Sequence, residues 1–267
     1  MNFKHIKKSI FLLTAALVMF TGCSKDFLDI NEDPNNPTEV SVATLLPRAE
    51  QYVAFSLGFS RGTTEIGLSE VLAVYTHQMV VREDADQYGA NGTEFNINGA
   101  WDSFYSHALP DLNAIIAQGT ERGNLTYVGI AKILKAYTFS QFVDVFGDIP
   151  FSEAARFSEG ITYAKFDDDA EIYPQLIAML DEGIADLNNT SAANSLKPGA
   201  NDLIYNGSKT NWIKAANTIK LKLYNQIRLT TDVSDEVSEL LAAPTTLISS
   251  TAGSFMFNFG PGITPVD

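Results

Sequence analysis

The chain has 267 residues, of which 45% are hydrophobic and 19% are charged, so it can build one or two domains with a substantial core and is not disordered. Its formal net charge of -14 argues against a nucleic-acid partner, because phosphate binding requires a basic surface. The same charge argues against electrostatic docking onto anionic lipid. The single cysteine excludes an internal disulfide and a metal site built from cysteines.

The N-terminus has the pattern of a secretory signal. Lys4, Lys7 and Lys8 precede an apolar run over residues 10–20, and small residues follow that run. The run has about half of the roughly 20 residues that a membrane-spanning helix requires. A retained transmembrane anchor is therefore not expected.

The single cysteine, Cys23, directly follows Thr21 and Gly22, and this ending resembles the lipobox of bacterial lipoproteins. The resemblance implies cleavage before Cys23 and attachment of lipid, palmitate included, to its thiol. Phe20 departs from the usual leucine of that motif. We expect residues 1–22 to be a lipoprotein signal peptide that leaves Cys23 at a membrane surface. An ordinary secreted protein with a chance cysteine is the alternative.

Residues 23–40 are acidic and rich in Asn and Pro, which is typical of an extended tether. Apolar residues at helical spacing then predict helices over residues 42–59, 64–81, 100–117, 125–146, 211–229 and 232–242. One more helix is predicted to begin at the acidic cluster 167–169 and to end near residue 187. Pro110 lies inside the third of these, where proline can kink a helix. Residues 255–267 show no helical pattern. The predicted class is mainly α, built from helix pairs.

Five segments resemble the SusD/RagB family, and together they cover nearly the whole chain in the family's order. They are Cys23–Asp29, Ala100–Ile116, Ala131–Pro150 with its ending Phe-Gly-Asp-Ile-Pro, Tyr173–Leu187 and Asn211–Tyr224. Residues 125–146 combine small and bulky side chains, a packing pattern that is also typical of helix-pair solenoids such as tetratricopeptide repeats.

The resemblance implies a helical fold with tetratricopeptide-like helix pairs and a lipid-anchored location on the surface of a Bacteroidetes outer membrane. It implies binding of oligosaccharide or peptide nutrients, a TonB-dependent SusC-like porin as partner, and neither catalysis nor a cofactor. Members of the family are usually about twice as long. Residues 41–267 are therefore expected to be the N-terminal portion of such a domain, a truncated member without its C-terminal part.

A polar break between the second and third predicted helices is the best candidate for ligand binding. Its aromatic residues lie outside any apolar period, and planar amides and carboxylates surround them. A flat apolar face beside such groups suits the vicinal hydroxyls of sugars, although a solvated loop remains the alternative. The candidate ligand-binding residues are Asp86, Tyr88, Asn91, Phe95 and Asn96.

Other candidates have plainer interpretations. Trp101 and Trp212 could stack on sugars, but both lie on apolar stripes and are expected in the core. His77 and His107 are expected to be half-buried and hydrogen-bonded. The acids within residues 167–171 could bind Ca²⁺, but without EF-hand spacing they are better explained as the first turn of a helix, so no metal site is expected.

Two other functions compete with nutrient binding. One is a structural or assembly lipoprotein that binds a partner protein without a small ligand. The other, weaker hypothesis is a peripheral glycosidase, which needs two carboxylates about 5–9 Å apart. The acids are numerous enough to leave such a pair open, but no Gly-x-Ser-x-Gly or His-Glu-x-x-His motif accompanies them. The sequence does not identify the ligand.

Overall fold

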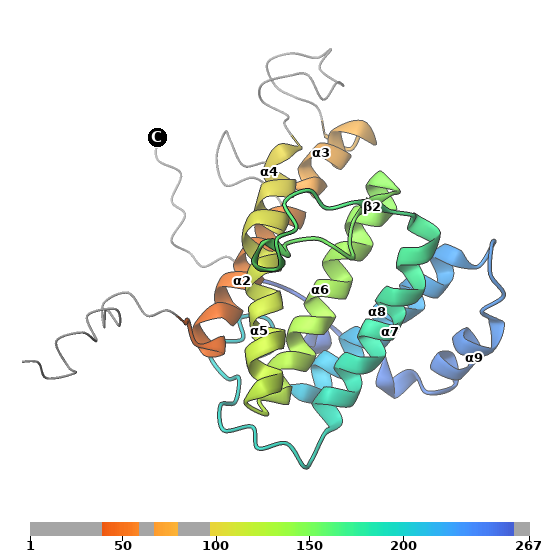
Figure 1. Ribbon diagram of the computed structural model, residues 1–267. Helices are drawn as coiled ribbons and strands as arrows, with labels where there is room; N and C mark the ends of the chain where they lie inside the picture. Colours follow the sequence, from red (N-terminus) through yellow and green to blue (C-terminus); the bar gives the residue numbers. More distant parts are fainter. Residues whose placement is uncertain (1–38, 59–66, 80–96, 259–267) are drawn as a thin grey trace, which may run out of the picture. The chain divides into compact units, whose positions relative to one another are not determined.

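A computed structural model describes residues 39–58, 67–79 and 97–258 (Figure 1). Residues Ser41–Asp267 form one compact unit of the chain. Within the described ranges this unit is mainly helical, which confirms the predicted fold class. The helices are α2 (Val42–Leu57), α3 (Leu68–Tyr75), α4 (Asn98–Trp101), α5 (Leu109–Glu121), α6 (Leu125–Phe146), α7 (Asp169–Asn188), α8 (Lys209–Ile227) and α9 (Ser234–Ala242).

Helix α6 lies at the centre of this unit, between α5 and α7 (Figure 1). Most of its residues are buried, and its partly exposed polar residues are Lys132, Lys135, Gln141 and Asp144. Tyr127, Phe139 and Phe142 are each at most 1% exposed. The predicted bounds 125–146 are confirmed. Gly147, which adopts a positive φ of 71°, ends the helix in a conformation that favours glycine.

Helices α6 and α7 approach each other closely at a pair of glycines. A Cβ atom on Gly129 would lie 2.7 Å from the Gly183 carbonyl oxygen and 2.8 Å from Leu187 Cγ. A Cβ atom on Gly183 would lie 3.0 Å from Ile133 Cγ1. The absence of side chains at these two positions therefore sets the distance between the helices.

The third predicted helix is present, but it changes its winding in the middle. A π-helical segment, Asp102–Ala108, joins α4 to α5 just before Pro110. Proline has no N–H to donate to the turn before it, and a local π-helical adjustment is one way in which a helix accommodates that loss. The segment carries Tyr105.

The second helix is shorter than the predicted range 64–81, whose two ends lie outside the described residues. Gly67 precedes α3 and packs so tightly that a Cβ atom there would lie 2.2 Å from the Gly58 carbonyl oxygen. At the other end the Thr76 hydroxyl donates to the Leu72 carbonyl at 2.8 Å, and His77 adopts a φ of 60°. The apolar period continues past Tyr75, but these backbone contacts end the helix.

A buried carboxylate ties the start of α8 to the loop before it. Asp202 Oδ2 accepts hydrogen bonds from the Trp212 indole at 2.7 Å and from the Gly207 N–H at 2.8 Å. The neighbouring Leu203 N–H donates to Glu50 Oε2 of α2 at 2.7 Å. Trp212 is fully buried, so its predicted place in the core is confirmed. These bonds connect three segments that are far apart in the sequence.

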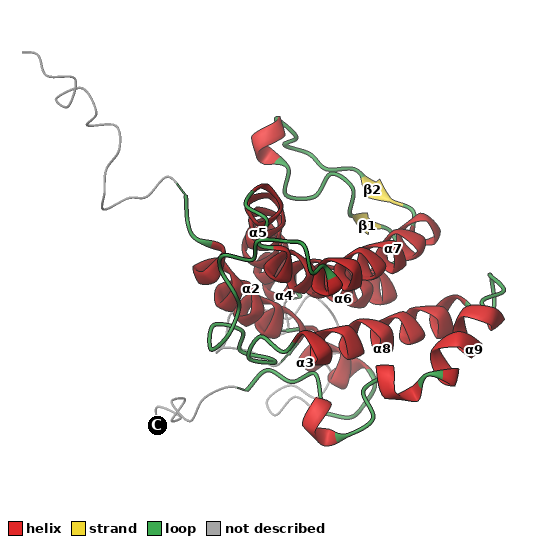
Figure 2. Ribbon diagram, turned by 90° about the horizontal axis from the view of Figure 1, so that it is seen from below, coloured by secondary structure: helices red, strands yellow, loops and turns green. Residues whose placement is uncertain are grey.

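A small antiparallel ladder lies beyond the C-terminal end of α6. Strand β1 (Ile149–Pro150) pairs with β2 (Phe166–Asp167), with Ile149 opposite Asp167 and Pro150 opposite Phe166. Figure 2 shows that the segment between the strands projects away from the helices. We call this segment, residues 151–165, the 151–165 loop.

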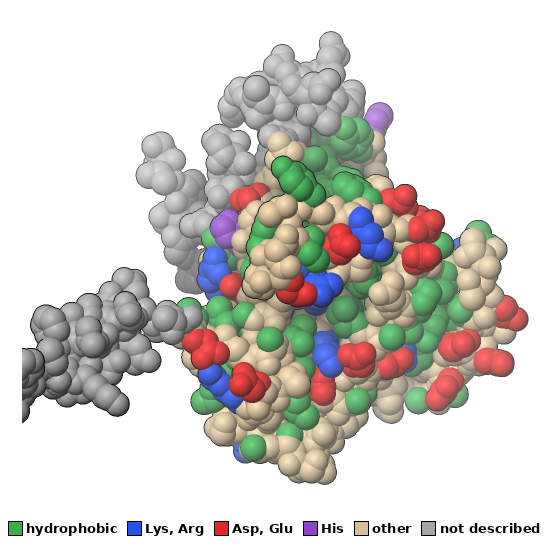
Figure 3. All heavy atoms as spheres, viewed as in Figure 1, with side chains coloured by type: hydrophobic (Ala, Val, Ile, Leu, Met, Phe, Trp, Pro, Cys, Tyr) green, Lys and Arg blue, Asp and Glu red, His purple; other side chains and the backbone are tan. Residues whose placement is uncertain are grey.

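The surface carries the acidic character of the composition. Acidic side chains gather over α7 and α9 on the face seen in Figure 3. On α9 these include the exposed residues Asp235, Glu236 and Glu239. None of the described helices combines the length and apolar character that a membrane span requires.

Candidate binding site

A buried carboxylate holds the two ends of the 151–165 loop together. Asp167 accepts hydrogen bonds from the N–H groups of Phe151 at 3.2 Å and Ser152 at 2.7 Å, and it pairs with the Lys165 ammonium at 2.8 Å. Burial opposes ionisation of Asp167, but Lys165 and the Ser152 and Phe151 donors outweigh it and hold its pKa below the ordinary value. The Lys165 N–H also donates to Glu153 at 3.0 Å.

The 151–165 loop and the helical segment from Trp101 to Pro110 enclose a hollow of about 550 Å³, which we call the aromatic hollow. Its volume lies within the range typical of ligand pockets. Two of its aromatic side chains are largely in solvent, Tyr163 at 93% exposed and Phe157 at 70% exposed. Large aromatic side chains that are exposed in this way often mark a surface that a ligand or a partner covers.

The opposite wall of the aromatic hollow is rigid. The Trp101 and Tyr105 rings stack with their centroids 4.8 Å apart and their planes 13° apart. The Tyr105 hydroxyl donates to the Pro150 carbonyl at 2.9 Å, which fixes the ring against β1. Burial raises the Tyr105 pKa far above its usual range, so this hydroxyl remains a donor. Trp101 packs against the core, as predicted, but it is only partly buried and also lines the aromatic hollow.

Polar groups accompany these rings at the edge of the aromatic hollow. Ser106, Glu153 and Thr162 line it together with the aromatic side chains. Hydroxyl groups and a carboxylate beside flat apolar faces make up the set of contacts that sugars use. Among the described residues that line this hollow, Glu153 is the only one with a carboxylate.

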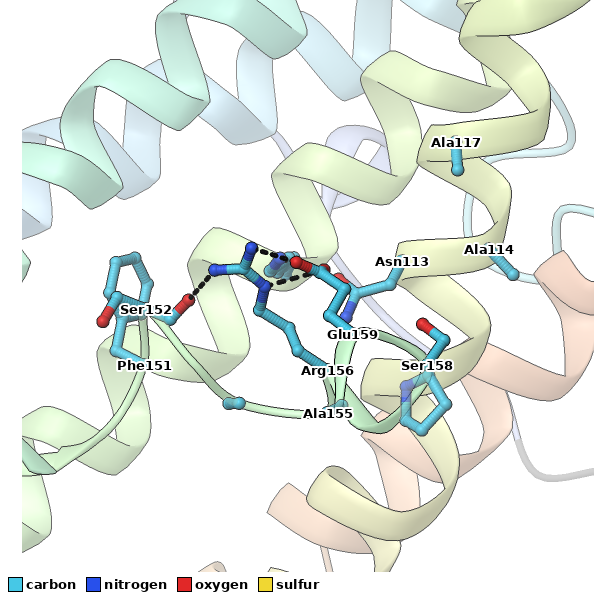
Figure 4. A pocket seen from close by; sticks show the side chains of 12 residues that line it. Asn113, Ala114, Ala117, Phe151, Ser152, Ala155, Arg156, Ser158 and Glu159 are labelled. Carbon is cyan, nitrogen blue, oxygen red and sulfur yellow. Dashed lines mark hydrogen bonds and ion pairs between the residues drawn. The ribbon is translucent and has the colours of Figure 1, made fainter. Parts of the chain in front are cut away.

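A second hollow of about 620 Å³, which we call the lysine hollow, shares Pro110, Ala154 and Ala155 with the first. In Figure 4, Asn113, Ala114 and Ala117 come from α5, and the facing residues come from the 151–165 loop. Arg156 Nε donates to Glu159 at 2.8 Å, and Arg156 Nη1 donates to the Ser152 carbonyl at 3.2 Å.

Lys135 of α6 also lines the lysine hollow. Its ammonium donates to Asn113 Oδ1 at 2.8 Å. Burial, with a smaller effect from Arg156, lowers the Lys135 pKa to about 8. The ammonium still carries most of its charge at neutral pH, in a setting that disfavours the charge.

The predicted ligand residues Asp86, Tyr88, Asn91, Phe95 and Asn96 lie outside the described residues, as does Cys23. The structure therefore does not test them. His107 is partly buried as predicted, stacked on Tyr52 with ring centroids 4.3 Å apart. His77, in contrast, is exposed at the end of α3, because the helix stops before it.

The acids near the start of α7 divide into different roles. Asp168 accepts a hydrogen bond from the Ala170 N–H at 2.9 Å, so it caps the helix as predicted for a first turn. Carboxylate oxygens of Asp148, Asp168 and Asp169 lie within 4.8 Å of one another, and all three residues are exposed. This arrangement could accept a hard cation, but exposed acids commonly gather without one.

Sequence reasoning missed Tyr105, Phe157, Tyr163 and Lys135 as residues of a site. Phe157 and Tyr163 satisfied the criterion applied to Tyr88 and Phe95, since they are aromatic residues in a loop without an apolar period. Tyr105 and Lys135 gave no such signal, because both lie in helices among apolar neighbours.

The fold defines a scaffold of packed helices from which one large loop projects. Comparisons with known proteins identify the family and find the same helical fold in solved structures. A model of a SusD-like family, described as starch-binding and associating with the outer membrane, matches residues 34–265. The chain belongs to this family. A comparison with curated proteins found no match.

Solved structures show the same fold. A SusD/RagB family protein from Bacteroides thetaiotaomicron matches with a TM-score of 0.67 and 24% identity over 80% of this chain and 44% of that chain. A chitin-binding protein matches with a TM-score of 0.62 and 23% identity over 81% and 46%. A SusD homologue from Bacteroides fragilis matches with a TM-score of 0.58 and 20% identity over 81% and 43%. The chain thus spans less than half the length of these relatives.

Proposed function

We propose that the protein is a non-catalytic, cell-surface lipoprotein that binds oligosaccharides and passes them to a TonB-dependent SusC-like porin of the outer membrane. Membership of a family described as starch-binding supports the class of ligand. The observation that carries the proposal is the aromatic hollow, which the exposed rings of Tyr163 and Phe157 line together with a stacked pair, Trp101 and Tyr105.

The arrangement favours binding over hydrolysis. A glycosidase needs a second carboxylate at a defined distance from the first, and Glu153 is the only described residue that brings one to the aromatic hollow. We retain Asp86, Tyr88, Asn91, Phe95 and Asn96 as proposed additional ligand contacts. A peptide ligand would use the same rings, so peptides belong in the test.

Calorimetry against a panel of oligosaccharides and short peptides tests the proposal. For an oligosaccharide that binds, Tyr163→Ala and Phe157→Ala should each weaken affinity about tenfold or more, as is typical when a large aromatic contact is removed. Leu229→Ala is the matched control, since Leu229 is 87% exposed on a different part of the unit and its truncation should change nothing.

Three outcomes would contradict the proposal. Turnover of a bound oligosaccharide would make the protein an enzyme, and tight binding that survives both aromatic substitutions would place the ligand elsewhere. Capture of a porin without affinity for any oligosaccharide or peptide would favour the structural or assembly function.

A further inference from the structure

Lys135 differs from the other lysines that make contacts in the described structure. Lys132, Lys165, Lys220 and Lys222 each form an ion pair with at least one carboxylate. The ammonium of Lys135 instead donates to the neutral amide oxygen of Asn113, and no carboxylate of the described residues pairs with it. A cation that is largely removed from water without a counter-charge costs free energy, and an anion beside it would recover much of that cost.

The surroundings of Lys135 leave space for such an anion. The lysine hollow has a volume of about 620 Å³, within the range of small-molecule sites. Arg156 adds a second positive charge, and the Glu159 carboxylate, which pairs with Arg156, offsets one of the two. The described charged groups that line the hollow therefore sum to one positive charge, and this charge lies in a chain whose net charge is -14.

A neighbouring feature indicates what the anion is attached to. The lysine hollow shares Pro110, Ala154 and Ala155 with the aromatic hollow, so a ligand that stacks on the rings next door extends toward Lys135. Ser158 adds a hydroxyl group, a type of group that can pair with a hydroxyl of a sugar.

We propose that the lysine hollow is a subsite for the carboxylate of an acidic oligosaccharide, in which the Lys135 ammonium binds a uronic-acid carboxylate. This inference rests on the proposed function, because it names the class of oligosaccharide that the site selects. The net charge of -14 gives an acidic ligand no long-range attraction, so selection depends on the short-range bond to Lys135.

Calorimetry near pH 7 with two probes, one charged and one neutral, tests the inference. Trigalacturonate carries the carboxylates, and its methyl ester has the same sugar skeleton without them. The parent protein should bind the free acid at least about tenfold more tightly, as expected for a hydrogen bond between charged groups. Lys135→Met should remove this preference, so that the free acid and the ester bind with similar affinity.

Lys220→Met is the charge-matched control, because Lys220 pairs with Asp181 between α7 and α8 and lines neither hollow. It should keep the full preference for the free acid. Binding of the ester also shows that each variant is folded. Lys135→Arg should restore part of the preference, which a purely structural role for Lys135 would not produce.

The outcomes separate this inference from the proposed function. If neutral oligosaccharides bind but the free acid has no advantage, or if the advantage survives Lys135→Met, the acidic subsite is refuted and the proposed function stands. If no oligosaccharide binds at all, both are refuted. Lys135-dependent binding of a peptide with a free C-terminal carboxylate, without binding of trigalacturonate, would also overturn the acidic-sugar assignment.

Discussion

Glu50 is a carboxylic acid enclosed by apolar groups. It is 1% exposed, and it lines a small hollow of about 210 Å³ with Val53, Tyr137 and Phe255 among its walls. Burial, reinforced by the nearby Asp202 carboxylate, raises the Glu50 pKa to about 9. Glu50 is therefore neutral at physiological pH and accepts the Leu203 N–H without adding charge to the core.

This raised pKa predicts how stability depends on pH. The ordinary pKa of 4.5 applies to the unfolded chain, so between that value and about 9 the folded state holds one more proton. The contribution of Glu50 to stability is complete below the unfolded pKa and is lost as pH rises toward the folded one, by up to roughly 1.4 kcal/mol per pH unit. Glu50→Gln keeps the shape and the acceptor but cannot ionise.

The stability of Glu50→Gln should therefore rise relative to the parent as pH increases from about 6 to about 8. Urea unfolding at several pH values measures the difference directly. Glu236→Gln on the exposed face of α9 is the control and should leave the pH dependence unchanged. If the Glu50→Gln and parent curves run parallel across this range, Glu50 is not a buried neutral acid.

At the scale of elements, the contact between α6 and α7 depends on Gly129. A methyl group there would meet the Gly183 carbonyl and the Leu187 side chain at under 3 Å. Gly129→Ala should lower the free energy of unfolding by about 1–2 kcal/mol, since separating the packed helices costs more than the higher helix propensity of alanine gains.

Denaturant unfolding of Gly129→Ala and Gly199→Ala checks this expectation. Gly199 has open space around its Cβ position, so alanine there should be neutral or slightly stabilising. Equal stability of the two variants would show that the glycine pair does not set the spacing between α6 and α7.

Helical periodicity predicted the elements well where the ends are set locally. The bounds of α6 follow from its continuous apolar content and from Gly147 and Pro150, all of which are visible in the sequence. The end of α3 was wrong by several residues because His77 adopts a positive φ, which the spacing of apolar residues does not reveal. Propensity is a weak guide where tertiary contacts compete with it.

The site was harder to predict than the fold for a similar reason. Lys132 and Lys135 lie three residues apart on one helix and look alike in the sequence. The structure pairs Lys132 with Glu182 and Asp186 of α7 and gives Lys135 only the amide of Asn113. That difference depends on which helix packs against each face, which the spacing of apolar residues does not specify.

At the scale of the whole molecule, the proposed location on a membrane depends on Cys23. We expect the parent to incorporate a palmitate analogue and to fractionate with membranes, and Cys23→Ala to lose both properties. Growth with a clickable analogue, followed by fractionation, measures both. A single acyl chain gives only marginal membrane binding. Complete loss of both labelling and membrane association in Cys23→Ala would identify Cys23 as the essential attachment point. Undiminished labelling of Cys23→Ala would remove the lipoprotein assignment.

The ladder between β1 and β2 has an evolutionary consequence. Two residues on each strand, together with the Asp167 carboxylate, fix both ends of the 151–165 loop to the helices. Ala154 and Phe151 pack against the core, so the part of the loop that is free to change is the largely exposed stretch 156–163. Insertions or deletions there should leave the packing of α5, α6 and α7 intact, because loops that are closed at their base tolerate changes in length at small entropic cost. Related proteins can therefore differ in this stretch while they share the same packed helices.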